Sequence, residues 1–478
     1  MTEFLTYEMF GAIGDGIADD MPAIVRAHEE ANRLALPVRA REGAAYYISP
    51  ADRTAVVKTS VNWTGARFII DDRDCENRNA PVFCVLSALE PAHLPITALS
   101  RGQTQIDNPT GLDLLVHVEN AHHMDYIRKG LNQDNGHPRS DILLLRADGT
   151  LTSPVACDFT EVTHVKAHPI DPERLTLTGG EFTTIANLNE SRYDYHARNI
   201  RISRSNVEIA ELTHLVTGET DHGAPYGGFL DLSSCADVLV RDCLFTAHRT
   251  YWTIGSAGLP VPMGSYDIGI GGVCNLSFIR CRQTTDILDK NYWGLIGSNC
   301  CRDILLEDCD FSRFDVHTGA YNCTLRRCRL GHQQLCAIGS GTFRVEDTEV
   351  WAHSFLHLRT DYGSLWRGDV IIRNCTWHPT DEKKCIISAS NDGTHYFGYE
   401  CFLPTHIDID GFTVAASAAG DEPLFVFNDY VGAEDISPEE RPFLPVPTES
   451  VRLRNVAPMQ DVRLCENPAL LTDTAFDA

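Results

Sequence analysis

Long apolar runs are missing from this sequence, and none approaches the roughly 20 residues that a helix needs to cross a bilayer. The amino terminus, MTEFLTYEMFGAIGDG, also lacks the basic segment followed by an apolar segment that marks a signal peptide. We therefore expect a cytoplasmic protein that has no membrane partner.

Positive charge is scarce. The chain of 478 residues has 40 lysines and arginines against 66 aspartates and glutamates, which gives a net charge of −26. Binding to nucleic acid without sequence preference needs a basic surface, so we expect no nucleic-acid partner. Any acidic ligand must be received by a local basic patch against the field of the whole chain.

The C-x-x-C pairs that hold structural zinc are absent, although the chain has 17 cysteines. In a long chain without an export signal, disulfides are not expected either. The cysteines are best interpreted as reduced, buried side chains that serve as small apolar groups. We expect no metal site and no cofactor, with bound Ca²⁺ left open as an alternative.

A short helix is predicted near the start of the chain. Apolar residues recur at helical spacing from Met21 to Leu34, and Asp19 or Asp20 can cap the first turn. Tight turns before it are supplied by Gly11, Gly14 and Gly16.

One short phrase recurs through the second half of the chain, as in VLVRDCLF, ILLEDCDF and CTLRRCRL. Apolar and polar residues alternate in each copy, which indicates strands. The gaps between successive copies are 38, 28, 19, 20, 27 and 37 residues. Gaps near 20 fit one bare coil of a β-solenoid, and longer gaps fit coils that carry loops. The copies are centred on Cys243, Cys281, Cys309, Cys328, Thr348, Cys375 and Phe412.

The amino-terminal stretch FGAIGDGIADDMPAIVRA resembles the opening of the pectate lyase and family 28 glycosidase superfamily, which includes phage tailspikes. The resemblance implies an all-β, right-handed parallel β-helix with a short N-terminal capping helix. We expect a cap over residues 1–40, the β-helix over 41–430, and a carboxy-terminal cap or arm over 431–478. The stretch HVENAHHMDYIRKGLNQDNGHPRSD is interpreted as a long loop or a helical excursion. A homodimer or homotrimer is possible in such a family.

Residues that exchange protons gather around Asp315. Asp315 and His317 are two positions apart, so in a strand both side chains point to one face. Lys290 lies 25 residues before Asp315 and His332 lies 17 after it, each close to one coil. We therefore expect Lys290, Asp315 and His332 to lie side by side on adjacent coils.

Such a cluster can remove the proton at C5 of a uronic acid. Asp315 and His317 would neutralise the sugar carboxylate if the aspartate is protonated or the histidine is cationic, which acidifies the neighbouring C–H bond. Lys290, Tyr292, Tyr321 or His332 would then serve as base and acid. The alternative is that Asp315 closes a turn and His317 is a surface histidine.

The phrase RFDVHTG resembles the active-site phrase F-D-P-H-D of the alginate C5-epimerases. The resemblance implies that Asp315 and His317 flank a uronate, with Lys290 on the preceding coil. The tyrosine of that family, three positions before the aspartate, falls on Ser312. The preferred interpretation is a lyase or C5-epimerase that acts on a uronic-acid-containing carbohydrate.

Two other functions compete with this one. GHQQLCAIGSG and TTDILD resemble phrases of the family 28 glycosidases, which implies inverting hydrolysis by paired carboxylates. The adjacent double aspartate of that family is replaced here by FDVH. The third possibility is a non-catalytic glycan-binding, tailspike-like protein. Carboxylates for hydrolysis are offered by Asp286, Asp289, Asp308, Asp310 and Asp315.

Further residues are candidates for binding the substrate. Aromatic rings can stack on sugars, and an arginine can pair bidentately with a carboxylate or sulfate. An ion pair between Arg359 and Asp361 is the simpler alternative for that arginine. The substrate-binding candidates are Trp293, Arg313, Tyr321, Arg359, Tyr362 and His222.

Overall fold

The structure is a computed structural model in which the described residues form a long stack of β-strands with one α-helix. It describes residues 3–127, 136–192, 195–254, 260–332, 334–359, 362, 366–380, 384–389, 399–415, 423–427, 446–457, 462–464 and 476–477. Within these residues no helix is long and apolar enough to cross a membrane.

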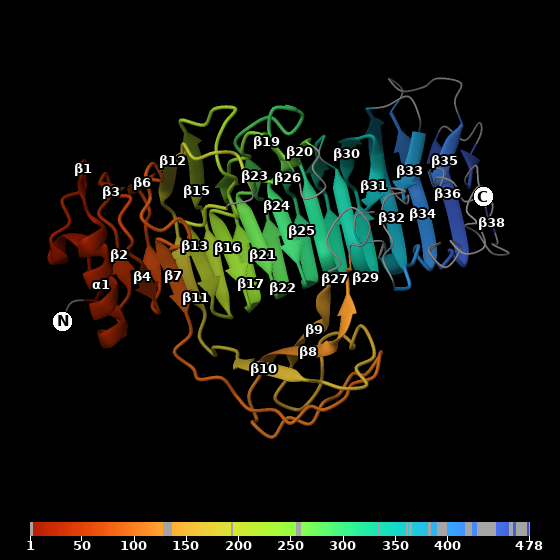
Figure 1. Cartoon of the computed structure of the whole chain (residues 1–478), viewed down its shortest axis with the longest axis horizontal. Coiled ribbons are helices and arrows are strands. Elements are labelled where there is room, and N and C mark those ends of the chain that lie inside the picture. The colour runs from red at the N-terminus through yellow and green to blue at the C-terminus, as the bar shows by residue number, and fades with distance from the viewer. Residues whose placement is uncertain are drawn as a thin grey trace.

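The stack is a right-handed parallel β-helix, as the sequence predicts. Its described strands form one sheet of 33 members, in which every pairing is parallel and each strand pairs with strands of the coils before and after it. Figure 1 shows the strands side by side from the N-terminal end to the C-terminal end. Alternating burial turns Val238 and Val240 of β17 (Ala236–Arg241), and Ile304 and Leu306 of β25 (Arg302–Glu307), into the core.

The strands of the main sheet before the insertion described below are β1 (Asp15–Asp19), β2 (Val38–Arg39), β3 (Ala45–Ile48), β4 (Ala55–Val57), β5 (Val61–Asn62), β6 (Arg67–Asp71) and β7 (Phe83–Leu86). The next strands are β11 (Leu175–Thr178), β12 (Glu181–Ile185), β13 (Ile200–Ser203), β14 (Val207–Ala210), β15 (Thr213–Thr217), β16 (Leu230–Ser233), β17, β18 (Leu244–Phe245), β21 (Ile268–Gly271), β22 (Cys274–Ile279), β23 (Arg282–Gln283) and β24 (Ile296–Asn299). The last are β25, β26 (Asp310–Phe311), β27 (Phe314–Arg326), β28 (Arg329–Leu330), β29 (Leu335–Glu346), β30 (Glu349–Ala352), β31 (Ser354–Leu358), β32 (Trp366–Pro379), β33 (Lys384–Ser388), β34 (His406–Val414), β35 (Leu424–Phe427), β36 (Ser450–Ala457), β37 (Val462–Arg463) and β38 (Phe476–Asp477). A separate hairpin pairs β19 (Tyr251–Ile254) with β20 (Pro260–Met263).

The N-terminal end of the stack is covered by a short 3-10 helix, η1 (Tyr7–Phe10), and by α1 (Met21–Leu34), which has the predicted bounds. The buried face of α1 packs against β4. Asp20 precedes the helix, but its carboxylate accepts hydrogen bonds from the amides of Ile13 and Gly14, at 2.6 and 3.1 Å. Asp20 therefore fixes the glycine-rich turn and does not cap α1 with its side chain.

The repeated phrase has the register that its gaps predict. Ile279 pairs with Glu307, Glu307 with Arg326, and Arg326 with Glu346, and each of these residues stands two positions before a centre of the phrase. Cys375 pairs with Phe412 directly. The thiols of Cys243, Cys281, Cys309 and Cys328, here called the cysteine ladder, are buried and form no disulfide. Recurrent cysteines are thus explained as small core side chains.

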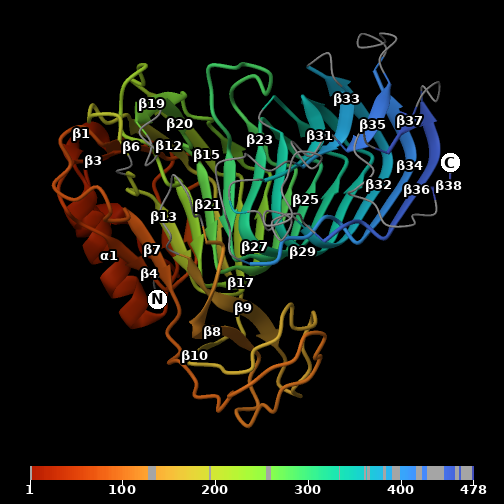
Figure 2. The same cartoon turned by 45° about the vertical axis from the view of Figure 1, so that its right-hand side comes forward.

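An insertion of different architecture leaves the stack after β7. Three strands, β8 (Leu114–Asp125), β9 (His137–Leu145) and β10 (His164–Pro169), form an antiparallel sheet with its own small hydrophobic core. Figures 1 and 2 show this sheet beside the middle of the stack. The prediction of a loop or helical excursion here is wrong for the described residues, because alternating apolar residues of β8 and β9 pair across a hairpin.

The carboxy-terminal residues predicted as a cap or arm fall partly outside the described residues. The residues of this region that form β36 continue the main sheet, since Phe412 of β34 pairs with Val456.

Candidate functional site

An open groove of about 970 Å³ crosses the outer face of β16, β21, β24, β27, β29 and β31. Asp315 and His317 both line it, as their spacing in a strand predicts. Arg313, Arg359, Trp293 and Tyr362 line it too. Four of the six substrate-binding candidates are therefore brought to the same groove as the Asp-x-His pair.

The floor of the groove is a row of residues in register on adjacent strands. Asp315 pairs with Gly297 on one side and with Cys336 on the other. Gly269 continues the row before Gly297, and His357 continues it after Cys336. Two successive glycines leave the floor without side chains beside Asp315, which makes room for groups from other segments.

Tyr266 occupies part of that space. A Cβ added to Gly297 would lie 3.3 Å from the ring of Tyr266, so the ring rests directly over the glycine. Its hydroxyl donates a hydrogen bond to Oδ2 of Asp315 at 2.8 Å. Burial and the charge of Asp315 raise the pKa of Tyr266 well above its usual value, so the phenol stays protonated.

Asp315 is held by two arginines. Arg313 Nη2 donates to Oδ2 at 2.8 Å, and Arg359 Nη1 lies 2.9 Å from both carboxylate oxygens. Asp315 and Arg313 are almost fully buried, whereas 18% of the Arg359 side chain is exposed. Burial alone would raise the pKa of Asp315, but the charges of Arg313 and Arg359 outweigh it and hold the pKa well below its usual range. Asp315 is therefore a carboxylate, and the prediction that it could act in protonated form does not fit this geometry.

His317 stands on a bulge of β27. Ser298 pairs with Val316 while Asn299 pairs with Thr318, so His317 is the extra residue between the two pairs. A bulge re-aims the side chain that it carries. Nδ1 of His317 lies 2.8 Å from Oδ1 of Asn299, which can only accept. The proton is thus on Nδ1, and in the neutral ring Nε2 carries the lone pair. Tyr362 packs edge-on against this ring, with centroids 5.4 Å apart.

Lys290 and His332 do not lie beside Asp315, and that prediction is wrong. The residues in register with Asp315 are 18 positions before it and 21 positions after it. Lys290 and Tyr292 lie in the segment between β23 and β24 and do not line the groove. His332 contacts the carbonyl of Ile287 in the same segment through Nδ1, at 3.1 Å. Burial, joined by the charge of nearby Lys290, lowers the pKa of His332. These three residues form a separate group.

Two of the predicted substrate-binding residues, His222 and Tyr321, lie outside the groove. His222 is exposed in the loop between β15 and β16 and does not line the groove. Tyr321 lies farther along β27 and faces the insertion. Asp361, considered as a partner of Arg359, lies outside the described residues.

Sequence reasoning missed Tyr266, Asn299 and His357. Tyr266 precedes Asp315 by 49 residues, so no local motif joins the two. A signal was nevertheless present, because the Ile-Gly pairs at Gly269 and Gly297 recur at coil spacing before Phe314–Asp315. Outward glycines on successive coils mark a place where another group approaches the backbone.

The carboxylates proposed for hydrolysis are not assembled. All five lie in the described part of the chain, and of these only Asp315 lines the groove. Asp231 lines it as well, but three strand steps separate it from Asp315, or about 14 Å. An inverting hydrolase places its two carboxyl groups about 6.5–9.5 Å apart. Among the described residues, no group of three or more His, Cys, Asp or Glu is placed to hold a metal ion.

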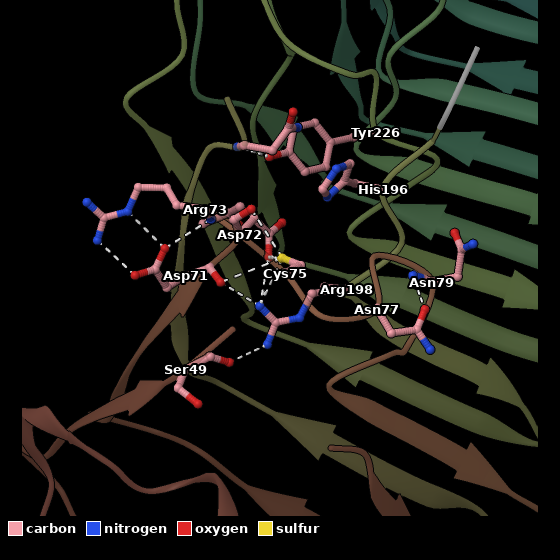
Figure 3. A network of polar contacts seen from close by, with 12 residues as sticks. Ser49, Asp71, Asp72, Arg73, Cys75, Asn77, Asn79, His196, Arg198 and Tyr226 are labelled. Atoms are coloured by element: carbon pink, nitrogen blue, oxygen red, sulfur yellow. Dashed lines mark hydrogen bonds and ion pairs between the residues drawn. The ribbon is translucent and has the colours of Figure 1, made fainter. Parts of the chain in front are cut away.

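A second polar network is centred on the buried side chain of Arg198 (Figure 3). Arg198 donates to the carbonyl oxygens of Asp71 and Ser49, at 2.5 and 2.7 Å, and forms an ion pair with Asp72 at 3.2 Å. Burial raises the pKa of Asp72 to about 7, against the charge of Arg198. These residues stand at the corners of successive coils, where they satisfy backbone carbonyls. These contacts link successive coils.

Comparison with known proteins gives a fold and no family. No family model matches the sequence, and no curated protein matches it. Among solved structures, the tailspike gp61 of Pseudomonas phage phi297 has a TM-score of 0.60 and 11% identity, over 100% of this chain and 84% of that one. The tailspike gp49 of Pseudomonas phage LKA1 has a TM-score of 0.56 and 14% identity, over 96% and 82%.

A third similar structure is the gp54 tailspike of Acinetobacter baumannii bacteriophage AP22, solved in complex with A. baumannii capsular saccharide. Its TM-score is 0.54 and its identity 10%, over 99% of this chain and 79% of that one. Identities this low establish the parallel β-helix alone.

Proposed function

We propose that this protein binds an acidic carbohydrate in the groove and removes the C5 proton of a uronic acid, which leads to β-elimination. The observation that carries the proposal is the arrangement of Arg313 and Arg359 on an ionised Asp315, with His317 two positions away. The AP22 tailspike, which shares the fold, binds a saccharide, and this supports a carbohydrate ligand here.

The arginines would receive the carboxylate of the sugar. A guanidinium has five N–H donors in a planar fork and can contact a second carboxylate while one nitrogen remains on Asp315. Arg359 is the partly exposed member of the pair, so we assign it the substrate contact. The carboxylate of Asp315 holds Arg359 in position, and the hydroxyl of Tyr266 holds that carboxylate. A neutralised carboxylate stabilises the negative charge that develops when C5 loses its proton.

His317 would remove that proton. Its Nδ1–H bond to Asn299 leaves the basic lone pair of the neutral ring on Nε2. The C5–H bond breaks, the proton passes to Nε2, and the electron pair moves into the sugar carboxylate. The electron pair then forms the C4–C5 double bond as the C4–O4 bond breaks, and the imidazolium returns its proton to O4. One imidazole thus serves as base and acid, and this favours elimination over epimerisation, which needs a second proton donor on the opposite face of the sugar.

The experiment is a panel of uronate-containing glycans followed by ultraviolet absorbance. Elimination gives an unsaturated product that absorbs, hydrolysis gives new reducing ends without absorbance, and epimerisation gives solvent deuterium at C5. The His317→Ala variant should lose activity by about 10²–10⁴-fold, the usual contribution of general acid–base catalysis. His222→Ala, at an exposed histidine outside the groove, is the matched control and should retain full activity. Full activity of His317→Ala, or binding without any of the three products, would overturn the proposal.

A further inference from the structure

A second hollow separates the insertion from the stack. It consists of two adjoining cavities of about 190 and 290 Å³, which share Ala156, Tyr321, Ser340 and Arg367. The insertion contributes one wall, including Arg101 and residues 154–156, and β27, β29 and β32 contribute the other. We call it the insertion cleft. Apart from Tyr321, none of these residues was singled out by the sequence.

The wall formed by the stack is another row in register. Arg302, Tyr321, Ser340 and Arg367 stand side by side on β25, β27, β29 and β32. Arg302 is buried and neutralised, since Nη2 lies 2.5 Å from Oδ1 of Asp141 and Nη1 donates to the carbonyl of Pro154 at 2.6 Å. Its guanidinium lies over the ring of Tyr321, 4.1 Å from the centroid. Arg302 therefore fixes both Tyr321 and the insertion.

Arg367 differs from Arg302 in its contacts, although Glu400 lines the same cavity. Its guanidinium lies 4.5 Å from the centroid of Phe402, and within the described residues no carboxylate forms an ion pair with it or with Arg101. Burial and the charge of Arg101 lower the pKa of Arg367, so the two cations are close enough to repel each other. The charges of Glu400, which lines the same cavity, and of Asp158 oppose this effect, and Asp369 also lines the cleft.

We propose that the insertion cleft binds an oxyanion, a carboxylate, sulfate or phosphate group, between Arg101 and Arg367, with Tyr321 as an adjoining surface. The group belongs to an acidic saccharide or is free in solution. Asp125 and Asp141, which also line the cleft, are paired with Arg139 and Arg302, whereas Arg101 and Arg367 form no ion pair within the described residues. A bound anion removes their mutual repulsion and satisfies guanidinium donors in a bidentate way.

The test is calorimetric titration of the full chain with sulfate, with phosphate and with an oligosaccharide that carries uronic acid. Arg367→Gln and Arg101→Gln should each weaken binding about ten-fold or more, as expected for loss of a charge-assisted contact. Arg33→Gln, at an exposed arginine of α1, is the control and should bind like the wild type. Since Arg101 is exposed, its replacement leaves the fold intact, and this keeps the test valid if Arg367→Gln fails to fold.

The groove is tested separately with His317→Ala, which should bind the inorganic anions as the wild type does. Binding of sulfate or phosphate that depends on Arg101 shows a site for free oxyanions. Binding of the saccharide alone, with the same dependence on Arg101, shows that the oxyanion must be attached to a sugar. Binding that is unchanged in Arg101→Gln and Arg367→Gln, or no binding of any of the three ligands, would refute the proposal. Unchanged binding in the two arginine variants does not bear on the reaction assigned to His317, whereas failure of the oligosaccharide to bind at all would count against both proposals.

Discussion

At the scale of single residues, Asp315 is the centre on which the groove depends. Its carboxylate is buried, and it meets Arg313, Arg359 and Tyr266. An isolated charge at this depth would be strongly unfavourable, so each member of the group requires the others. Asp315 is therefore a positioning residue that sets where the guanidiniums stand.

The Asp315→Asn variant tests this dependence. It leaves the charge of Arg313 buried without its partner, so the free energy of unfolding should fall by about 3 kcal/mol. Urea denaturation followed by circular dichroism measures the change. Asp308→Asn, which breaks an exposed ion pair with Arg327, is the matched control and should change stability little. Equal losses in the two variants would contradict the buried character of the Asp315 group.

His248 gives the protein a pH-dependent stability. Glu219 lies 2.9 Å from its Nδ1 and Asp267 lies 3.4 Å from its Nε2, and the ring is buried. Burial alone would lower the pKa of His248, but the two carboxylates outweigh it and raise the pKa to about 10. An unfolded histidine has a pKa of about 6.5, so the folded state holds this proton more tightly.

The contribution of His248 is therefore complete below about pH 6.5 and is lost as pH rises through about 10. We expect the melting temperature to fall over this interval. The His248→Gln variant should be less stable than the wild type at pH 7 and should show a smaller fall towards pH 10. Parallel pH profiles for the two proteins, recorded by scanning calorimetry, would assign the dependence to other groups.

At the scale of strands and coils, the sequence predicted the register of the repeated phrase correctly. It did not predict which residues of the variable loops lie side by side. The gaps between ladder residues gave the right register because every copy of the phrase occupies the same corner of its coil. Lys290 and His332 were placed by the same arithmetic, but they stand in corners whose loops vary in length. A difference near 20 residues identifies neighbours only when both ends belong to the repeated phrase.

The groove contains residues that the sequence identified and residues that it did not. Asp315 and His317 could be found from their spacing within one strand, and that spacing holds in spite of the bulge. Tyr266 could not be found in this way, because it stands two coils before Asp315 in the stack. It reaches Asp315 through a space that only Gly269 and Gly297 leave open. The bulge itself depends on pairing with β24 and β29, which a single sequence does not reveal.

The cysteine ladder gives a prediction at this scale. Burial raises the pKa of the Cys309 thiol, so the folded protein should not react with thiol reagents at this position. Labelling followed by peptide mass spectrometry should show modification of Cys309 after denaturation only. The Cys309→Ala variant should lose about 1 kcal/mol of stability, as expected for a small cavity. Rapid labelling of native Cys309 would show that the stack opens at this coil.

At the scale of the whole molecule, the groove and the insertion cleft each hold arginines on a protein that is acidic overall. The net charge of −26 acts over distances of tens of ångströms at low ionic strength, whereas the arginine contacts act within about 4 Å. Under the proposed function, a polyanionic glycan would be repelled at long range and held at short range. The two effects respond differently to salt, which screens distant charges first.

Association of an acidic oligosaccharide should therefore become faster as salt rises from about 0.01 to 0.15 M, because the screening length falls from about 30 to about 8 Å. Most acidic ligands bind basic sites more slowly as salt rises, so the sign of the change is diagnostic. Surface plasmon resonance with immobilised protein measures the association rate, and a neutral oligosaccharide of equal length is the control. The Arg359→Gln variant should keep the salt response of the association rate while it dissociates faster, since it lacks a local contact and retains the overall field. An association rate that falls steadily with salt in the wild type would show that the basic patches dominate the field even at long range.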